Sequence, residues 1–188
     1  MKLGKTLYVT NRQDWRKWLA KHHKTEPEIW LLYYKIDSGK PRIPYNDAVE
    51  EALCYGWIDS TVKGIDKHSF AQRFSPRRST SILSETNKER IRRLIAEGKM
   101  TQAGLDAIAH VFDQKKDTTK RFVIPPDILR SLKADKETWA NFQKFPSSYQ
   151  RIRVAWIDDS RVRPDEFAKR LRYFLKMTKQ NKRFGMVQ

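Results

Sequence analysis

Hydrophobic and polar positions in the first part of the chain follow two different periods. Residues 7–9 form a short apolar run typical of a strand, and Asn11 then suits the N-cap of a helix. Trp15, Trp18 and Leu19 recur in that helix at spacings of three and four, so we expect them to belong to the core. The beginning of the chain therefore mixes strand and helix.

A buried strand, a second helix and a hairpin are predicted next. Residues 29–34 are apolar and aromatic and are followed by a turn-forming stretch, which favours a strand. Apolar side chains recur at helical spacing from Ala48 to Trp57, and we expect Gly56 to end the regular helix. Residues 61–65 and 70–74 are typical of two strands, and the polar turn between them indicates a hairpin.

Helical spacing takes over in the rest of the chain. Ser84 and Thr101 are candidate caps for two helices, and the polar tract 113–120 then interrupts the pattern. We predict an α+β fold with N-terminal helices packed on a small antiparallel sheet in residues 1–116. An all-α C-terminal helical unit should follow in residues 117–188.

The last predicted helix, which starts near Pro164, separates apolar from basic side chains. Its apolar face should be made by Phe167, Leu171, Phe174 and Leu175. On the opposite arc we expect Lys169, Arg172, Lys176, Lys179 and Arg183. These basic side chains should be solvated, and the first four are the candidate nucleic-acid contacts.

The charge of the chain changes what these elements can bind. With 39 Lys and Arg against 22 Asp and Glu, the formal net charge is +17, which attracts polyanions. Residues 1–116 carry 22 basic and 14 acidic groups, net +8, whereas residues 117–188 carry 17 and 8, net +9. The basic excess is denser in the C-terminal part. The partner would be a nucleic acid, another anionic ligand or an anionic membrane surface, and the alternative is a basic surface that only maintains solubility.

Compartment signals are few. No run of about 18 apolar residues could span a bilayer, and residues 1–10 lack an apolar stretch of signal-peptide length. Cys54 is the single cysteine, so the chain cannot form an intramolecular disulfide. We expect a cytoplasmic protein without a membrane span, and the sequence has no feature that fixes its oligomeric state.

The densest group of candidate binding residues lies around the predicted hairpin and the Arg- and Ser-rich loop after it. Guanidinium groups and hydroxyls in one loop suit a phosphate or carboxylate. The anion-binding candidates are Tyr55, Trp57, Asp59, Arg73, Ser75, Arg77, Arg78, Asn87 and Arg90. Because sequentially adjacent elements tend to pack together, we expect seven of these side chains to lie close in space. They are Tyr55, Trp57, Asp59, Arg73, Ser75, Arg77 and Asn87.

A structural interpretation of the same residues stands beside the functional one. The loop could be a rigid turn whose arginines pair with Asp59, Asp66 or Glu85. Trp57 and Phe74 could stack a base, but as members of apolar patterns they are more typical of a core.

No catalytic residue, metal site or cofactor is predicted. Cys54 lies in an apolar helix with no histidine at a diagnostic spacing, so we expect a packed thiol. His22 and His23 are adjacent, which directs their rings to different helix faces. The seven glycines are scattered and form no phosphate loop. We expect a non-enzymatic protein; an enzyme for a small anionic substrate would need a pocket that holds an acid with a perturbed pKa.

Several motifs resemble the YdeI/OmpD-associated family. In the N-terminal part they are Glu28-Ile29-Trp30-Leu31, Tyr45-x-x-Ala48-Val49-Glu50-Glu51-Ala52-Leu53-Cys54-Tyr55-Gly56-Trp57-Ile58-Asp59-Ser60 and Arg73-Phe74-Ser75-Pro76-Arg77. Further along they are Asn87-Lys88-x-Arg90, Gly98-Lys99-Met100-Thr101-x-Ala103-Gly104, Phe122-x-Ile124-Pro125, Ala134-Asp135, Phe142 and Pro146-Ser147. The chain departs from the family pattern at Ser81-Ile82-Leu83-Ser84 and at Glu166-Phe167, where a tryptophan and an arginine are usual.

The resemblance implies a bacteriocin-protection or stress-resistance protein whose N-terminal part is near the YjbR/CyaY-like folds. It implies no catalytic residue. Our leading hypothesis is therefore a non-enzymatic protein that acts in antimicrobial-peptide or stress resistance by binding an anionic partner. A nucleic-acid-binding protein that uses its basic C-terminal helix is the first alternative, and an enzyme acting on a small anionic substrate is the second.

Overall fold

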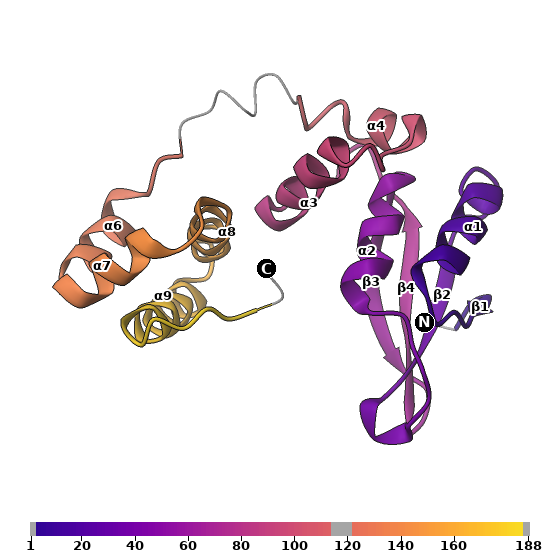
Figure 1. The fold of residues 1–188 in the computed structure, drawn as a ribbon, viewed down its shortest axis with the longest axis horizontal. Helices are drawn as coiled ribbons and strands as arrows, with labels where there is room; N and C mark the ends of the chain where they lie inside the picture. The colour runs from indigo at the N-terminus through magenta and orange to yellow at the C-terminus, as the bar shows by residue number, and fades with distance from the viewer. Residues whose placement is uncertain (1–2, 114–121, 186–188) are drawn as a thin grey trace. The chain divides into compact units, whose positions relative to one another are not determined.

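The structure is a computed structural model that describes residues 3–113 and 122–185. The chain divides into two compact units (Figure 1). The N-terminal unit contains Met1–Ile82 and Arg90–Asp113, and the C-terminal unit contains Leu83–Glu89 and Gln114–Gln188. An α+β part is followed by a helical part, which confirms the predicted fold class. The polar tract 113–120 lies, apart from Asp113, outside the described residues.

The N-terminal unit is built on one mixed four-stranded sheet with the strand order β1-β2-β4-β3. Strand β4 (Ser69–Pro76) lies antiparallel between β2 (Ile29–Tyr34) and β3 (Trp57–Gly64). Strand β1 (Thr6–Leu7) instead pairs in parallel with β2. The prediction of an antiparallel sheet is therefore wrong for β1, because the helical crossover through α1 (Arg12–His22) returns the chain in the same direction.

The second helix ends before Gly56, as predicted, and Trp57, which its spacing grouped with that helix, begins a strand. Helix α2 (Tyr45–Cys54) ends at Cys54, and Gly56 has a φ of 74°. That left-handed conformation is accessible to glycine without steric cost. Trp57 then pairs with Pro76 across the β3–β4 hairpin. The hairpin itself, with its turn around residues 66–68, is confirmed.

Helices α1 and α2 cover one face of the sheet (Figure 1). The ring of Trp15 on α1 contacts Phe74 at 5.5 Å between ring centroids, and Trp18 contacts Trp57 at 5.7 Å. Trp15, Trp57 and Phe74 are at most 1% exposed, so their assignment to the core is confirmed. Cys54 is also fully buried.

Two capped helices follow the hairpin in the sequence. Helix α3 (Glu85–Ala96) begins after Ser84, whose hydroxyl accepts from the Asn87 N–H at 3.3 Å. Helix α4 (Gln102–Ile108) begins after Thr101, whose hydroxyl accepts from the Gly104 N–H at 3.3 Å. Both predicted caps are confirmed. A short 3₁₀ helix, η1 (Ile36–Ser38), follows β2.

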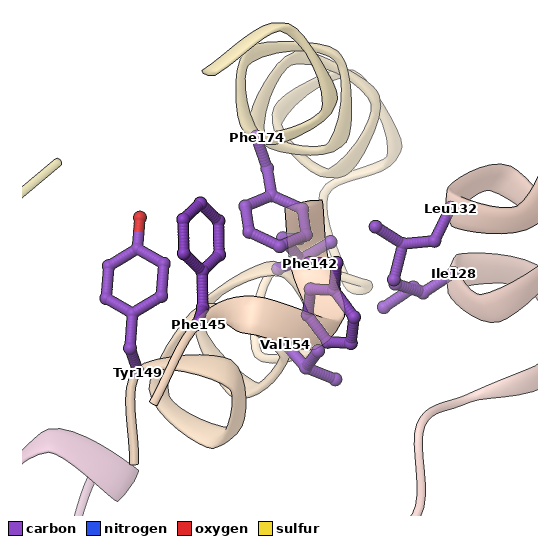
Figure 2. Close-up of a cluster of buried hydrophobic side chains, with 8 residues drawn as sticks. Ile128, Leu132, Phe142, Phe145, Tyr149, Val154 and Phe174 are labelled. Carbon is purple, nitrogen blue, oxygen red and sulfur yellow. The ribbon is translucent and has the colours of Figure 1, made fainter. Parts of the chain in front are cut away.

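The described part of the C-terminal unit contains four further helices around one aromatic core (Figure 2). They are α6 (Pro126–Lys133), α7 (Lys136–Lys144), α8 (Ser147–Asp158) and α9 (Pro164–Lys179). The core is made by Ile128, Leu132, Phe142, Phe145, Tyr149, Val154, Ile157 and Phe174. Of the predicted apolar face of α9, Phe174 is buried, and Phe167, Leu171 and Leu175 pack partly buried against the same cluster. Arg183, expected on the opposite face of this helix, lies beyond its end.

Candidate functional site: a buried arginine, a polar network and a basic helix face

Trp57 and Asp59 point to the helix-covered face of the sheet. The Trp57 indole N–H donates to the His23 carbonyl at 3.1 Å. One Asp59 carboxylate oxygen accepts from the Tyr45 hydroxyl on α2 at 2.6 Å. Burial is the main cause that raises the pKa of Tyr45, and the bond to Asp59 adds to it. Tyr45 therefore acts as a hydrogen-bond donor that holds Asp59.

Arg73 and Ser75 point to the other face of the same sheet, because side chains alternate along β4. Arg73 Nε donates to Glu28 at 2.6 Å, and its Nη1 lies 3.2 Å from the Ser60 hydroxyl and 3.4 Å from the Ser75 hydroxyl. The bond that Glu28 accepts from Trp30, together with Arg73, lowers the pKa of Glu28. The predicted candidates are thus divided between two faces of one sheet.

Arg77 lies at the end of the hairpin beside Gly56, whose carbonyl accepts from the Arg77 N–H at 2.8 Å. Its side chain is only 8% exposed. Nη1 donates to the carbonyls of Ser81 and Ile82, both at 3.3 Å. The structural interpretation expected a carboxylate partner for this arginine, but the hydrogen bonds that it makes go to backbone oxygens.

The remaining anion-binding candidates lie in different surroundings. The Tyr55 ring packs on His23 at 5.1 Å and lies under the Arg16 guanidinium at 5.4 Å. Arg78 is exposed in the loop after β4, whereas Arg90 donates to the Asn46 side chain at 2.8 Å. Asn87 belongs to the part of α3 that groups with the C-terminal unit.

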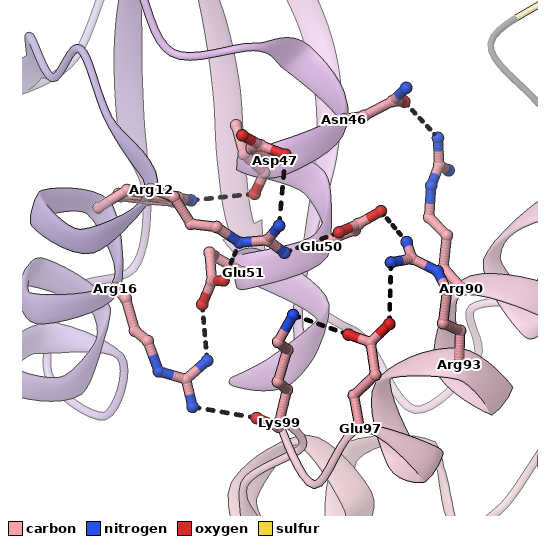
Figure 3. A network of polar contacts seen from close by, with 12 residues as sticks. Arg12, Arg16, Asn46, Asp47, Glu50, Glu51, Arg90, Arg93, Glu97 and Lys99 are labelled. Atoms are coloured by element: carbon pink, nitrogen blue, oxygen red, sulfur yellow. Dashed lines mark hydrogen bonds and ion pairs between the residues drawn. The ribbon is translucent and has the colours of Figure 1, made fainter. Parts of the chain in front are cut away.

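Sequence reasoning missed an ionic network centred on two buried acids of α2 (Figure 3). Glu51 is 2% exposed and accepts from Arg12 Nε at 2.5 Å and from Arg16 Nη1 at 2.7 Å. Glu50 is 6% exposed, accepts from Arg12 Nη2 at 2.7 Å and pairs with Arg93 of α3. The network joins α1, α2 and the end of α3.

The network also shows how burial and pairing compete. Burial by itself lowers the pKa of Arg12, but its hydrogen bonds to Glu51 and Glu50 outweigh that effect, and the pKa is raised. For Arg90 burial is the larger cause, and its pKa is lowered. The sequence signal was the Glu50-Glu51 pair inside an otherwise apolar helical pattern, since buried acids need cationic partners.

The basic face of α9, defined here as Lys169, Arg172 and Lys176, is exposed. None of these three forms a salt bridge within residues 3–113 and 122–185. Lys179, the fourth predicted contact, is paired with Asp135 at 3.0 Å. That bond raises the pKa of Lys179. The structure therefore separates three cations that face solvent from one that is held by the protein.

Sequence reasoning also missed Arg153 on α8. It is 7% exposed, and its guanidinium carbon lies 4.6 Å from the ring centre of Phe184, with Tyr149 and Trp156 at 5.3 and 5.8 Å. Burial lowers its pKa. The spacing of Tyr149, Arg153 and Trp156, at four and three residues on one helix, was the signal that could have found it.

The single cysteine, Cys54, lies in the N-terminal unit and is buried. Burial, with a smaller contribution from the charge of Glu51, raises the pKa of the Cys54 thiol to about 11, so the thiolate is scarce at neutral pH. In the part of the chain that the structure describes, His, Cys, Asp and Glu side chains do not gather in threes as metal ligands would. Nor is any described helix both long and apolar enough to cross a membrane.

Together these observations define a basic α+β protein with an all-α C-terminal unit and buried arginines in both units. Comparison with protein families then places it: the chain belongs to the family of a domain of unknown function (DUF8412), whose model matches residues 7–107. Residues 121–181 match the model described as bacteriocin-protection, YdeI or OmpD-associated. No curated protein and no solved structure matched the chain significantly.

The two matches refine the family resemblance inferred from the motifs. A YdeI/OmpD-associated segment is confirmed for residues 121–181. The N-terminal motifs, from Glu28 to Gly104, were attributed to the same family, but residues 7–107 match a different family model. The likeness of the N-terminal part to YjbR/CyaY-like folds stays a prediction.

Proposed function

We propose that this protein is a non-enzymatic, cytoplasmic protein that binds a nucleic acid through the basic face of α9. The observation that carries the proposal is the pairing pattern on that helix. Lys169, Arg172 and Lys176 are exposed and form no salt bridge within the described residues, whereas the opposite side of α9 is fixed in the core by Phe174. The cations are therefore held on a rigid support and are ready to contact phosphates.

The spacing of the three cations supports a polyanion as the partner. Lys176 lies seven positions after Lys169, which is roughly 10 Å along a helix that rises about 1.5 Å per residue. A duplex carries about one negative charge per 1.7 Å of its axis, so a row of this length lies opposite several phosphates. The dense positive charge of residues 117–188, net +9, adds long-range attraction.

The family description supplies the biological setting of the proposal. The matching model for residues 121–181 is described as bacteriocin-protection, and we propose a role in antimicrobial-peptide or stress resistance. Direct capture of cationic peptides is disfavoured, because a chain of net charge +17 repels them. Binding of an anionic partner inside the cell is the role that fits the charge.

The test replaces Lys169, Arg172 and Lys176 with Gln and measures duplex and single-strand affinity across a salt series. We expect weaker binding to all sequences alike, and a salt slope on duplex DNA that is smaller by about 0.9 for each lost contact. Lys179→Gln is the matched control on the same helix, since Lys179 is occupied by Asp135. Lys179→Gln should reduce the affinity less than replacing Lys169, Arg172 or Lys176 alone with Gln.

Two outcomes would contradict the proposal. Wild-type protein that fails to bind nucleic acid even at low salt would reject it, and binding to anionic vesicles in the same buffer would then point to a membrane surface. Unchanged nucleic-acid binding by the triple variant, with helicity preserved in circular dichroism, would move the contact away from α9.

A further inference from the structure

Arg77 in the N-terminal unit leaves one edge of its guanidinium unused. Its Nε and Nη2 atoms are buried and have no hydrogen-bond partner in the described structure. Only Nη1 is engaged, through two long bonds of 3.3 Å to the carbonyls of Ser81 and Ile82. A buried donor without a partner forfeits the hydration it would have in water, and the loss is larger for a charged group.

The unused atoms form a specific donor pair. Nε–H and the nearer N–H of Nη2 lie on the same edge of the planar guanidinium and point in parallel directions. That edge matches two oxygens of one carboxylate or phosphate group, which is why arginine binds such groups in a bidentate manner. Two donors left open on one edge are therefore a recognition surface for an oxyanion.

Within residues 3–113 and 122–185, no carboxylate is hydrogen-bonded to this edge. Asp59 is the acid whose charge acts on Arg77, but Arg77 forms no salt bridge with it within the described residues, and one Asp59 oxygen is held by Tyr45 at 2.6 Å. Burial outweighs that charge, and the pKa of Arg77 is lowered. The positive charge is thus only partly compensated within the unit.

The loop over Arg77 is lightly attached and rich in further donors. Residues 78–80 and 82 are exposed. Besides the two 3.3 Å bonds to Arg77, the loop has one turn bond, from the Ser81 N–H to the Arg78 carbonyl at 3.0 Å. Ser79, Thr80 and Ser81 add three hydroxyls, which suit the remaining oxygens of a tetrahedral anion.

We propose that Arg77 anchors a binding site for a phosphate group, with Nε and Nη2 donating to two of its oxygens and the loop 78–82 moving aside to admit it. The ligand is a free phosphate ion or the terminal phosphate of a small phosphomonoester. This site goes beyond the proposed nucleic-acid contact, because it lies in the other unit and takes a single phosphate. The three loop hydroxyls and the partly uncompensated charge of Arg77 favour a phosphate dianion over a carboxylate.

The experiment titrates the full-length wild-type protein with inorganic phosphate and follows the arginine Nε–H signals by NMR. Sodium chloride at equal ionic strength is the reference, because a protein of this charge responds to salt in general. We expect the Arg77 Nε–H signal to shift saturably with phosphate and not with chloride. A parallel titration with a phosphomonoester shows which source binds more tightly.

Two variants assign the effect to the guanidinium edge. Arg77→Lys keeps a positive charge but removes the bidentate edge, and Arg78→Lys makes the same change in an exposed neighbour. Phosphate should raise the Tm of the wild type and of Arg78→Lys, and the rise should be lost in Arg77→Lys. An equal rise in Arg77→Lys would overturn the proposal, as would a wild-type Arg77 signal that phosphate leaves unmoved.

The result is independent of the nucleic-acid proposal. The variant that lacks the three cations of α9 should bind phosphate with unchanged affinity, since those residues belong to the C-terminal unit. Loss of phosphate binding in that variant would place the ion on α9 and overturn the Arg77 site. If Arg77→Lys does not fold, the wild-type NMR titration still decides the question.

Discussion

At the residue scale, Glu51 is the side chain on which the ionic network of the N-terminal unit depends. It is the most buried acid in that network and accepts hydrogen bonds from two arginines of α1 (Figure 3). Removing one member of a buried ion pair leaves the partner's charge without compensation. Glu51 therefore fixes α1 against α2 through charged hydrogen bonds from Arg12 and Arg16.

Glu51→Gln should destabilise the protein strongly, although the substitution hardly changes the shape of the side chain. We expect a loss of about 2–3 kcal/mol in the free energy of unfolding, because Arg12 and Arg16 keep their charges in a partly buried place. Urea unfolding measures it. Glu97→Gln is the matched control, since Glu97 pairs at the surface, and its loss of stability should be much smaller. Equal small losses would show that the network does not stabilise the fold.

At the element scale, α4 packs on the end of α2 through a glycine. A Cβ atom at Gly104 would lie 2.3 Å from the Cys54 carbonyl oxygen and 2.9 Å from that of Leu53. Thr101 donates from its hydroxyl to the same Cys54 carbonyl at 2.6 Å. The motif around Gly98–Gly104 thus lets two helices approach to backbone contact and satisfies a carbonyl at the end of α2.

Gly104→Ala should destabilise the N-terminal unit although alanine is the better helix former. Helix propensity alone would favour alanine by about 1 kcal/mol. The clash with a backbone carbonyl should exceed this gain, for a net loss of about 2 kcal/mol in the free energy of unfolding. Gly64→Ala meets no atom within 4 Å and is the control. A stabilised Gly104→Ala variant in thermal unfolding would show that α4 can move without cost.

Helix α7 depends on a carboxylate cap, which makes the C-terminal unit sensitive to acid. Asp135 accepts from the Thr138 N–H at 2.8 Å and from its hydroxyl at 2.8 Å, and these bonds, with Lys179, lower the pKa of Asp135 to about 2. A carboxylate whose pKa is lower in the folded than in the unfolded state stabilises the fold at pH values above its unfolded-state pKa, about 3.9. The contribution should be lost as the pH falls from about 4 to about 2.

Asp135→Asn tests that pH dependence, because asparagine can still cap the helix but does not titrate. The variant should lose less stability than the wild type between pH 4 and pH 2, as measured by urea unfolding at each pH. Asp165→Asn is the comparison at an acid of the first turn of α9. Identical pH profiles for Asp135→Asn and the wild type would contradict the role of this carboxylate.

At the scale of the whole molecule, the boundary between the parts is a testable proposal. We propose domains of residues 1–116 and 117–188, although Leu83–Glu89 group with the C-terminal unit in the structure. Glu89 accepts from Arg151 Nε at 2.7 Å, which ties this short segment to α8. The aromatic core of the C-terminal unit lies entirely within residues 128–174 (Figure 2).

Fragments decide where the boundary falls. Residues 117–188 expressed alone should be helical and unfold cooperatively in urea, because they retain the whole aromatic core. Residues 83–188 should be somewhat more stable, since they restore the Glu89–Arg151 pair. A fragment 117–188 that stays unfolded while 83–188 folds would move the domain boundary to Leu83.

The sequence alone determined the elements whose signals are local. A short apolar run before a turn predicted β2, a polar turn between two strand-like runs predicted the hairpin, and helical spacing predicted most helices. The side chains of Ser84 and Thr101 marked helix starts, because caps act within one turn. Apolar periodicity also identified Trp15 and Phe74 as core residues. The basic face of α9 followed from the same period, but the pairing of Lys179 with Asp135 and the end of the helix before Arg183 were not foreseen.

Tertiary structure alone decided the features that join residues far apart in the chain. The parallel pairing of β1, the strand that starts at Trp57 and the division of Arg73 and Asp59 between two sheet faces depend on register and crossover direction, which local spacing does not contain. The partners of Glu51 come from another helix, and the unused edge of Arg77 depends on how a loop folds over it. Hydrogen bonding inside a protein is satisfied by neighbours in space, and the sequence orders only neighbours along the chain.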